Sequence, residues 1–254
     1  MLFEEIHLIW HEVISEVRKL SHVEIDLKKL YHEMILQHKS FEKSLSYILS
    51  DKLSNPMFPN SFFQKIIENI YISNPSIIQC AIKDIYAVYY RDPVIKNYSS
   101  ILLYLKGFHA LQIYRVSHQL WKIGRNSLAI FLQHRSSMLF SVDIHPAANI
   151  GYGIMLDHAT GIIIGETVLI ENNVSILHAV TLGSTGKKIG KRHPTIREGV
   201  MIGAGAKILG DIEIGLRTKI GAGSVVLRSI PADVTAVGVP ARIITKSVEK
   251  ISIY

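Results

Sequence analysis

Between residues 142 and 227 an aliphatic residue returns at every sixth position, with only two interruptions. The series is Ile144, Ile150, Leu156, Ile164, Ile170, Ile176, Leu182, Ile196, Ile202, Ile208, Ile214, Ile220 and Val226. The following position often holds a glycine, which we expect to let the backbone turn without a steric penalty from Cβ, as at Gly151, Gly165, Gly183, Gly203, Gly215 and Gly221. A hexapeptide period predicts a parallel β-helix, whose short strands stack coil on coil around an aliphatic core.

The two interruptions mark insertions. The step from Leu156 to Ile164 is eight residues instead of six, so two extra residues must bulge out between them. The step from Leu182 to Ile196 is fourteen, so a loop leaves the coil at residues 183–195. Loops inserted at solenoid corners usually lie on the face that binds something. Each interruption contains a histidine, His158 or His193.

Residues 1 to about 140 have helical spacing instead. Apolar residues recur at intervals of three and four near the N-terminus and again after Asn74-Pro75, which we expect to begin a helix that Asp92-Pro93 stops. One long helix is expected from about 101 to 123, ended by Gly124, and another from about 127 to 140. The predicted fold class is α+β, with a helical domain at 1–141 and a β-helix domain at 142–254. The β-helix should end near Arg228, where Pro231 breaks the last strand, and a short tail should follow.

Composition narrows the function. Of the 254 residues 48% are hydrophobic, but no apolar run approaches the roughly 18 residues that a spanning helix needs. The N-terminus lacks the basic start of a signal peptide, so we expect a cytoplasmic protein with no membrane partner. The net charge of +7 has its one cluster in the loop, at Lys187, Lys188, Lys191 and Arg192. No nucleic-acid motif or aromatic platform accompanies it, so we expect no nucleic-acid partner.

Several longer strings resemble a known family. They are RDP at 91–93, YLKGFHA at 104–110, DIHPAA at 143–148, GIMLDHATG at 153–161, RHP at 192–194 and GVPAR at 238–242. In this order they resemble the hexapeptide-repeat acyltransferases, and within them the serine O-acetyltransferase family of cysteine biosynthesis. The resemblance implies a left-handed β-helix, a homo-oligomer of trimers joined in pairs into a hexamer by the N-terminal helices, and acetyl-CoA and L-serine as substrates.

Acetyl transfer to a hydroxyl requires a base, because an alcohol is a poor nucleophile at neutral pH. Histidine, with an unperturbed pKa of about 6.5, suits that role, and a carboxylate on its second nitrogen would fix the tautomer. By resemblance His158 is the base and Asp143 is its partner. A free amino acid carries an ammonium and a carboxylate. The resemblance assigns Asp92 and Asp157 to the ammonium, and Arg192 and His193 to the carboxylate.

Acetyl-CoA needs a narrow groove for its pantetheine arm and cations for its phosphates. Small and basic residues in the last coils are the candidates, namely Ala204, Gly205, Lys219, Ala222, Gly223, Ser224 and Arg242. No metal is expected. Cysteine differs from serine only by its thiol, so we expect it to inhibit. Family members that dock onto O-acetylserine sulfhydrylase do so through an extended tail ending in isoleucine. The end at Ile253-Tyr254 makes such a complex doubtful.

Two other functions fit parts of the sequence. A zinc hydro-lyase of the γ-carbonic anhydrase type uses the same solenoid with three histidines at a subunit interface, for which His158, His178 and His193 are candidates. A non-catalytic solenoid that only holds partners is the second alternative, although it would not require the histidine–carboxylate pair or the amino-acid clamp. Metal analysis of the purified protein separates the zinc enzyme from the acyltransferase.

Overall fold

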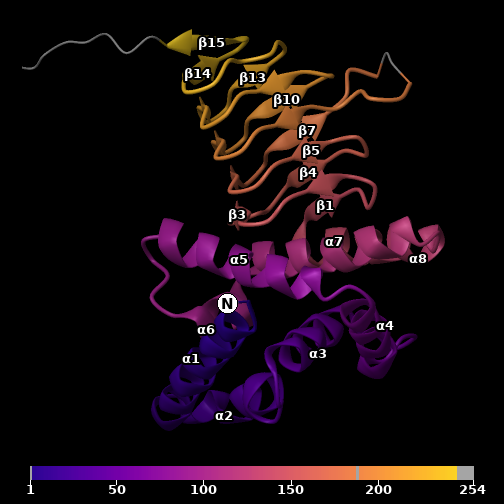
Figure 1. Cartoon of the computed structure of the whole chain (residues 1–254), viewed down its shortest axis with the longest axis vertical. Coiled ribbons are helices and arrows are strands. Elements are labelled where there is room, and N and C mark those ends of the chain that lie inside the picture. The colour runs from indigo at the N-terminus through magenta and orange to yellow at the C-terminus, as the bar shows by residue number, and fades with distance from the viewer. Residues whose placement is uncertain (1, 187–188, 245–254) are drawn as a thin grey trace, which may run out of the picture.

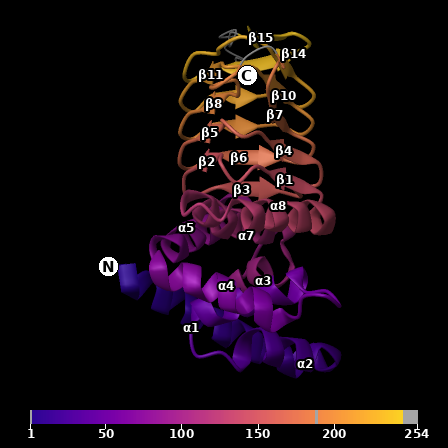
Figure 2. The ribbon, with the colours of Figure 1, turned by 90° about the vertical axis from the view of Figure 1, so that its right-hand side faces the viewer.

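In the computed structural model, which describes residues 2–186 and 189–244, a layer of helices supports a parallel β-helix whose coils stack away from it (Figure 1). The view at right angles shows the coils one above another, with α5, α7 and α8 lying beneath the first coil (Figure 2). The predicted α+β architecture, with helices first and a hexapeptide solenoid second, is confirmed.

The helical part has eight α-helices and two short segments within the described residues. They are α1 (Leu2–Val23), η1 (Ile25–Leu27), α2 (Lys28–Tyr31), η2 (His32–Leu36), α3 (Phe41–Leu53), α4 (Asn60–Ser73), α5 (Ser76–Arg91), α6 (Tyr98–Tyr104), α7 (Lys106–Lys122) and α8 (Asn126–Phe140). Helix α5 ends directly before Asp92-Pro93, as predicted, because proline disfavours a helical conformation in the residue before it. Among the described residues no helix has both the length and the apolar character to cross a membrane.

The single helix expected from about 101 to 123 is wrong. The helix is interrupted at Leu105, whose backbone is extended at φ −81° and ψ 103°, and α6 and α7 lie on either side of this residue. The break brings the start of α7 against the solenoid. A Cβ on Gly107 would lie 2.1 Å from the Leu156 carbonyl oxygen, so only glycine permits this approach. Gly124, at φ +79°, follows the end of α7 as predicted.

The β-helix has three parallel sheets, one on each face. The first sheet holds β1 (Val142–Ile144), β4 (Ile162–Ile164), β7 (Thr181–Gly183), β10 (Lys207–Leu209) and β13 (Val225–Val226). The second holds β2 (Asn149–Ile150), β5 (Leu169–Ile170), β8 (Thr195–Ile196) and β11 (Glu213–Ile214). The third holds β3 (Met155–Asp157), β6 (Ser175–Leu177), β9 (Met201–Ile202), β12 (Lys219–Ile220) and β14 (Thr235–Gly238), with β15 (Ala241–Ile244) antiparallel at its end. The sixth-position aliphatic residues point inward, and all but the half-buried Ile150 are buried, which confirms the period.

The glycines after those positions have a different role from the one predicted. None of the six is in the left-handed region, so they do not turn the backbone. They allow neighbouring coils to approach instead. A Cβ on Gly203 would lie 2.6 Å from the Ala222 nitrogen, and one on Gly215 would lie 2.4 Å from the Ala232 nitrogen. Contact between coils, and not local backbone strain, therefore accounts for glycine at these two positions.

The predicted end of the solenoid near Arg228 is also wrong. Ile230 bridges to Ile214, and β14 pairs in parallel with β12, placing Ala236 opposite Ile220. Ile230 and Ala236 continue the buried series, but the step from Val226 to Ile230 is only four residues, which conceals the repeat. Pro231 lies in a turn between coils. The predicted tail beyond 244 lies outside the described residues.

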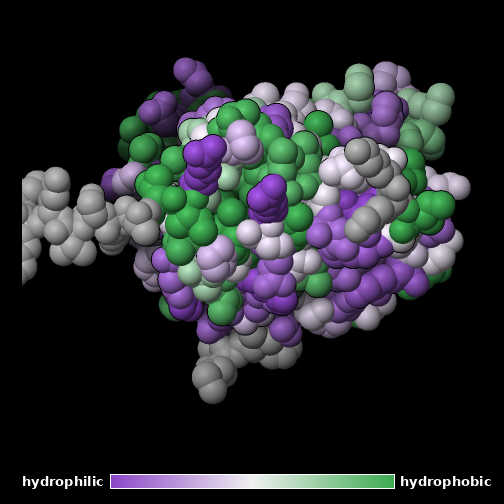
Figure 3. All heavy atoms as spheres, turned by 90° about the horizontal axis from the view of Figure 1, so that it is seen from above, coloured by the Kyte–Doolittle hydropathy of each residue, from purple (hydrophilic) through white to green (hydrophobic). Residues whose placement is uncertain are grey.

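The two ends of the solenoid differ. The helical layer buries the first coil, whereas the far end carries exposed apolar side chains, among them Leu227, Val239 and Ile244. Figure 3 looks onto this far end and shows hydrophobic residues gathered beside polar ones. The helices therefore pack against the solenoid at its N-terminal end, where α5 and α7 contact β3 and α7 and α8 contact β1.

Candidate active site

The two extra residues after Leu156 form a corner between the third and first sheets. His158 and Ala159 both have positive φ, at 53° and 59°, and the Thr160 amide donates to the His158 carbonyl at 2.8 Å. Consecutive left-handed non-glycine residues are costly and are typical of functional sites. The bulge turns His158 outward, so its side chain is 77% exposed. We call this corner, repeated up the solenoid at 158–161, 178–180, 203–206 and 221–224, the His158 edge.

A cavity of about 420 Å³ lies between the end of α5, the α6–α7 junction and β3. Its ionisable lining residues with polar chemistry toward a ligand are Asp92, Lys106, Asp157 and His158, and the rest of the wall is largely apolar. Asp92 directly follows α5, and Asp157 ends β3. The two carboxylates predicted to hold an ammonium therefore line the same cavity as the predicted base, although Asp92 and Asp157 are 65 residues apart in the chain.

The carboxylates of this cavity are held differently. One oxygen of Asp92, Oδ1, accepts from the Val94 amide at 2.9 Å, which fixes the turn after α5. Asp157 Oδ1 lies 3.8 Å from His158 Nε2. Lys106 donates to the Thr160 hydroxyl on the bulge and so brings a cation to the same wall. Lys106 was not among the predicted site residues, although it lies within the resembling string at 104–110.

Asp143 does not contact His158 in this chain. It lies on β1, and its Oδ1 accepts a hydrogen bond from Gln133 Nε2 of α8 at 2.6 Å. The His158 ring instead leans toward His178 of the next coil, with ring centroids 5.9 Å apart. The predicted pair is near in topology, because β1 neighbours the strand that follows the bulge, with Asp143 opposite Ile163.

The small residues predicted for acetyl-CoA lie on the His158 edge, above His158. The Gly205 amide donates to the His178 carbonyl at 2.9 Å, and the Gly223 amide donates to the Ala204 carbonyl at 2.8 Å, so this corner stacks coil on coil. Ala222 and Gly223 are exposed, and a Cβ on Gly223 would meet no atom within 4 Å. The edge is therefore open beside these residues.

The remaining predicted cofactor residues differ in exposure. Ser224 is fully buried, and its hydroxyl accepts from the Gly238 amide at 3.1 Å, so its side chain points away from a ligand on this edge. Lys219 lies on β12 and Arg242 on β15, and both are exposed. These two cations lie near the far end of the solenoid, well separated along the edge from His158.

Arg192 and His193 lie at another corner, between the first and second sheets, which we call the His193 edge (145–148, 165–168, 184–186 and 189–194). Arg192 forms an ion pair with Glu166, and this hydrogen bond lowers the pKa of the Glu166 carboxyl. His193 is 6% exposed, and its Nδ1 lies 2.8 Å from the Thr167 hydroxyl. Burial, followed by the nearby Arg192 charge, lowers the pKa of His193. A Cβ on Gly165 would lie 2.2 Å from His193 Nε2, so glycine at this position makes room for the imidazole ring.

The predicted acceptor clamp is therefore divided within one chain. Asp92, Asp157 and His158 share the cavity, whereas Arg192 and His193 lie at a different corner of the prism. Thr167, which orients His193, was missed by the sequence analysis because its position after the inward Ile164 carries no pattern of its own. Over residues 2–186 and 189–244, no group of three metal-ligating side chains comes together.

Comparisons with known proteins identify the family of this chain. Residues 9–113 match the family described as serine acetyltransferase, N-terminal, and residues 193–228 match the bacterial transferase hexapeptide repeats. The chain is 56% identical to the serine acetyltransferase of Escherichia coli strain K12 over 246 residues, covering 97% of this chain and 90% of that protein.

Two solved structures are similar over nearly their whole length. A serine acetyltransferase in complex with cysteine has a TM-score of 0.92 and 56% identity, covering 93% of this chain and 98% of that one. A serine acetyltransferase in complex with CoA has a TM-score of 0.91 and 54% identity, covering 96% and 100%. With matches of this extent in sequence and in fold, the chain belongs to the serine acetyltransferase family of acyltransferases.

Proposed function

We propose that this chain transfers the acetyl group of acetyl-CoA to the hydroxyl of L-serine, giving O-acetylserine and CoA, at the cavity between α5, α7 and β3. One observation carries the assignment of the site. Two carboxylates and an exposed histidine, Asp92, Asp157 and His158, line a single cavity at the foot of an open edge of small residues. Such a cavity suits a small acceptor that carries an ammonium group, beside a long, thin donor.

His158 acts as the general base. It takes the proton of the serine hydroxyl as the oxygen attacks the thioester carbonyl, so that a C–O bond forms and the C–S bond breaks. The imidazolium then returns the proton to the leaving CoA thiolate. Asp143 stabilises the imidazolium in this proposal. Because Asp143 is bonded to Gln133 here, such a pair requires the exposed His158 side chain to rotate toward the first sheet.

Asp92 and Asp157 hold the ammonium of serine. Both carboxylates lie on the cavity wall, and Asp157 stands next to the base in sequence and within 3.8 Å of it in space. An ammonium between them would be bound by two charge-assisted hydrogen bonds, which are stronger than neutral ones. This places the hydroxyl of a small amino acid, rather than its charged ends, toward His158.

The carboxylate of serine is held by Arg192 and His193 of a neighbouring copy. Within one chain these residues lie on the His193 edge, away from the cavity. A cyclic trimer that sets the His158 edge of one copy beside the His193 edge of the next would complete three equivalent sites. The helical layer, residues 1–141, then serves two purposes in the proposal: it supplies Asp92, and it joins two trimers into a hexamer.

Acetyl-CoA runs along the His158 edge. Ala204, Gly205, Ala222 and Gly223 leave the corner narrow and open, so the pantetheine arm can approach the backbone. Its thioester end then points toward His158, and its phosphates point toward the exposed Lys219 and Arg242. Ser224 contributes its backbone and not its hydroxyl, which is bonded to Gly238.

Cysteine binds the same site as serine in this proposal. It presents the same ammonium and carboxylate to Asp92, Asp157, Arg192 and His193, and the similar protein in complex with cysteine supports the assignment. Shared recognition makes cysteine a competitive inhibitor with respect to serine. The reaction and its inhibitor together place the chain at the step that commits serine to cysteine biosynthesis.

The test is thiol release from acetyl-CoA with L-serine, homoserine, a galactoside or no acceptor. Release that depends on L-serine, and that falls when cysteine is added, is the expected result. Equal rates with the galactoside, or release with no dependence on an acceptor, would contradict the assignment of serine. Replacing Asp92 with Ala should weaken serine and cysteine together, because both ammonium groups use the same carboxylate.

A further inference from the structure

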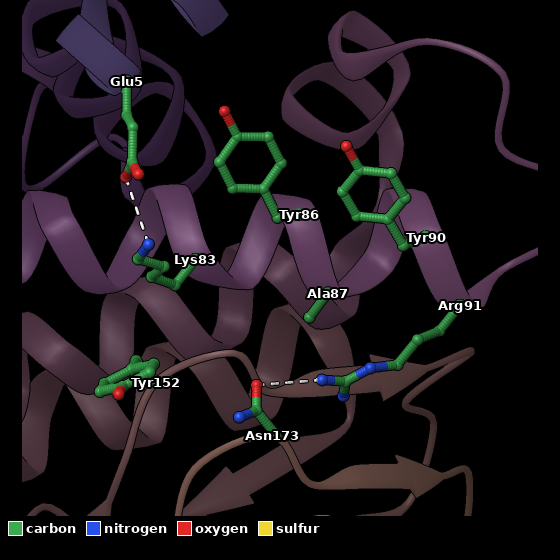
Figure 4. A pocket seen from close by; sticks show the side chains of 8 residues that line it. All are labelled: Glu5, Lys83, Tyr86, Ala87, Tyr90, Arg91, Tyr152 and Asn173. Carbon is green, nitrogen blue, oxygen red and sulfur yellow. Dashed lines mark hydrogen bonds and ion pairs between the residues drawn. The ribbon is translucent and has the colours of Figure 1, made fainter. Parts of the chain in front are cut away.

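Arg91 joins the end of α5 to the solenoid. Its guanidinium donates from Nη1 to the Ser175 hydroxyl at 3.1 Å and from Nη2 to Asn173 Oδ1 at 3.2 Å. The Val174 carbonyl lies 3.5 Å from Nη1. Figure 4 shows the Arg91 side chain leaving the end of α5 toward Asn173, whereas Tyr86 and Tyr90 point to the other side of the helix. All three acceptors belong to one turn of the second coil.

The acceptor turn is itself held firmly. Asn173 has φ +61°, its amide donates to the Tyr152 carbonyl at 2.9 Å, and its Nδ2 donates to Glu198 Oε1 at 2.9 Å. A Cβ on Gly153 would lie 2.5 Å from Asn173 Oδ1, so this glycine leaves space for the amide. Arg91 is therefore anchored to a fixed part of the solenoid and not to a loop that could follow the helix.

Arg91 and Lys83 also line a hollow of about 420 Å³ beside α5, which does not have the features of a separate ligand site (Figure 4). Lys83 lies 3.2 Å from Glu5, and the Arg91 guanidinium already donates to Ser175 and Asn173. Both cations of the hollow thus have partners within the chain. The contacts of Arg91 serve to fix the position of the α5 end.

The residue after Arg91, Asp92, lines the acceptor cavity and not the hollow beside Lys83. Asp92 lines the acceptor cavity, together with Asp157 and His158, and its Oδ1 is used by the turn at Val94. Ser175, which Arg91 holds, begins β6, and β6 pairs with β3 so that Leu177 lies opposite Asp157. Arg91 therefore ties α5 to the same sheet that carries Asp157.

We infer that Arg91 is a positioning residue for the acceptor site, which sets the distance between Asp92 and the Asp157–His158 pair. This inference rests on the proposed function, because it takes Asp92 as a ligand of the serine ammonium. Arg91 does not touch the acceptor. It holds the C-terminal end of α5 against the second coil, so that the carboxylate of the next residue faces the cavity at the separation that an ammonium can bridge.

The experiment compares Arg91→Ala, Arg91→Lys and the matched control Lys83→Ala, which removes the other, half-buried cation of the same hollow. Arg91→Ala should raise the serine KM about tenfold, as for a lost charged hydrogen bond, and leave the acetyl-CoA KM within about twofold. Arg91→Lys should recover part of this loss, because an ammonium can reach one of the two acceptors. Lys83→Ala should resemble the wild type in both KM values.

A double-mutant cycle with Asp92→Asn shows whether Arg91 acts through Asp92. If it does, adding Arg91→Ala to Asp92→Asn should not raise the serine KM further, because the two effects share one path. Additive losses, an unchanged serine KM in Arg91→Ala, or an equal rise in the acetyl-CoA KM would each overturn the inference. Should Arg91→Ala not fold, the same cycle is measured with Arg91→Lys and Ser175→Ala. A wild type without serine-dependent thiol release would contradict the proposed function instead.

Discussion

The His158 edge and the His193 edge are two corners of the same solenoid, and their two histidines differ in exposure and in hydrogen bonding. His158 is 77% exposed, sits on a strained bulge and borders a cavity. His193 is 6% exposed, bonded to Thr167, and flanked by an ion pair between Arg192 and Glu166. The first histidine is accessible to a ligand from the cavity, whereas the second is held in one orientation by Thr167. This difference matches the proposal, in which the His158 edge supplies the base and the His193 edge supplies groups that bind the serine carboxylate.

Replacing His158 tests the reactive edge and should have the largest effect. We expect His158→Ala to lower kcat by about 10²- to 10⁴-fold, the range for loss of a general base. His11→Ala, which removes an exposed histidine of α1, serves as the matched control and should leave kcat unchanged. Steady-state rates on variants with the wild-type oligomeric state decide the matter. Wild-type turnover by folded His158→Ala would remove His158 from the base role.

Replacing Arg192 tests the recognition edge. We expect Arg192→Ala to raise the serine KM by roughly 10- to 100-fold, with a smaller change in kcat, because a charge partner of the carboxylate is lost. The acetyl-CoA KM should change less, since its predicted site lies on the other edge. An acetyl-CoA KM that rises as much as the serine KM would place Arg192 on the donor and not on the acceptor.

Mixing the two variants tests whether the edges meet between copies. If each site takes His158 from one copy and Arg192 from the next, an equal mixture of co-refolded His158→Ala and Arg192→Ala, assayed at serine below the wild-type KM, should recover about one quarter of wild-type activity from statistically intact sites. Each variant refolded alone provides the control. No recovery in a mixed oligomer, confirmed by differently tagged copies, would mean that both residues serve a site within one chain.

The supporting carboxylate should matter less than the base. We expect Asp143→Asn to lower kcat by less than the roughly 10²- to 10⁴-fold loss in His158→Ala, because Asp143 orients and stabilises the imidazolium without receiving the proton. Gln133→Leu removes the present hydrogen-bond partner of Asp143 and shows whether that hydrogen bond affects kcat. A loss in Asp143→Asn as large as in His158→Ala would show that the two act as one unit.

The buried histidine of the His193 edge should make the stability of the protein depend slightly on pH. The pKa of His193 is lowered by burial, so the folded protein binds its proton less readily than the unfolded chain does. Stability from this site is therefore complete above the unfolded pKa of about 6.5 and is lost as the pH falls from there toward the folded pKa. Melting temperatures of the wild type and His193→Gln between pH 7.5 and 5.5 measure this. We expect the difference between them to narrow at the lower pH.

Local patterns were sufficient for part of this structure. The sixfold aliphatic period required a solenoid, because each coil can bury its apolar residues only against its neighbours. Its two interruptions located the His158 bulge and the loop before His193, because inserted residues must leave a stack of regular coils at a corner. Asp92-Pro93 ended α5 because proline disfavours a helical conformation in the residue before it, which is a local effect.

Contacts between distant segments decided the rest. The break at Leu105 accompanies the close approach of Gly107 to Leu156 of the first coil, which the helical spacing of this stretch did not indicate. The solenoid continues to Ala236 because β14 pairs with β12, although the shortened step after Val226 hides the repeat. The period placed His158 and His193 on corners but did not show that the corners differ. That separation, and the approach of Asp92 to Asp157, depend on how the helical layer docks onto the first two coils, which is a matter of packing between surfaces and not of pattern along the chain.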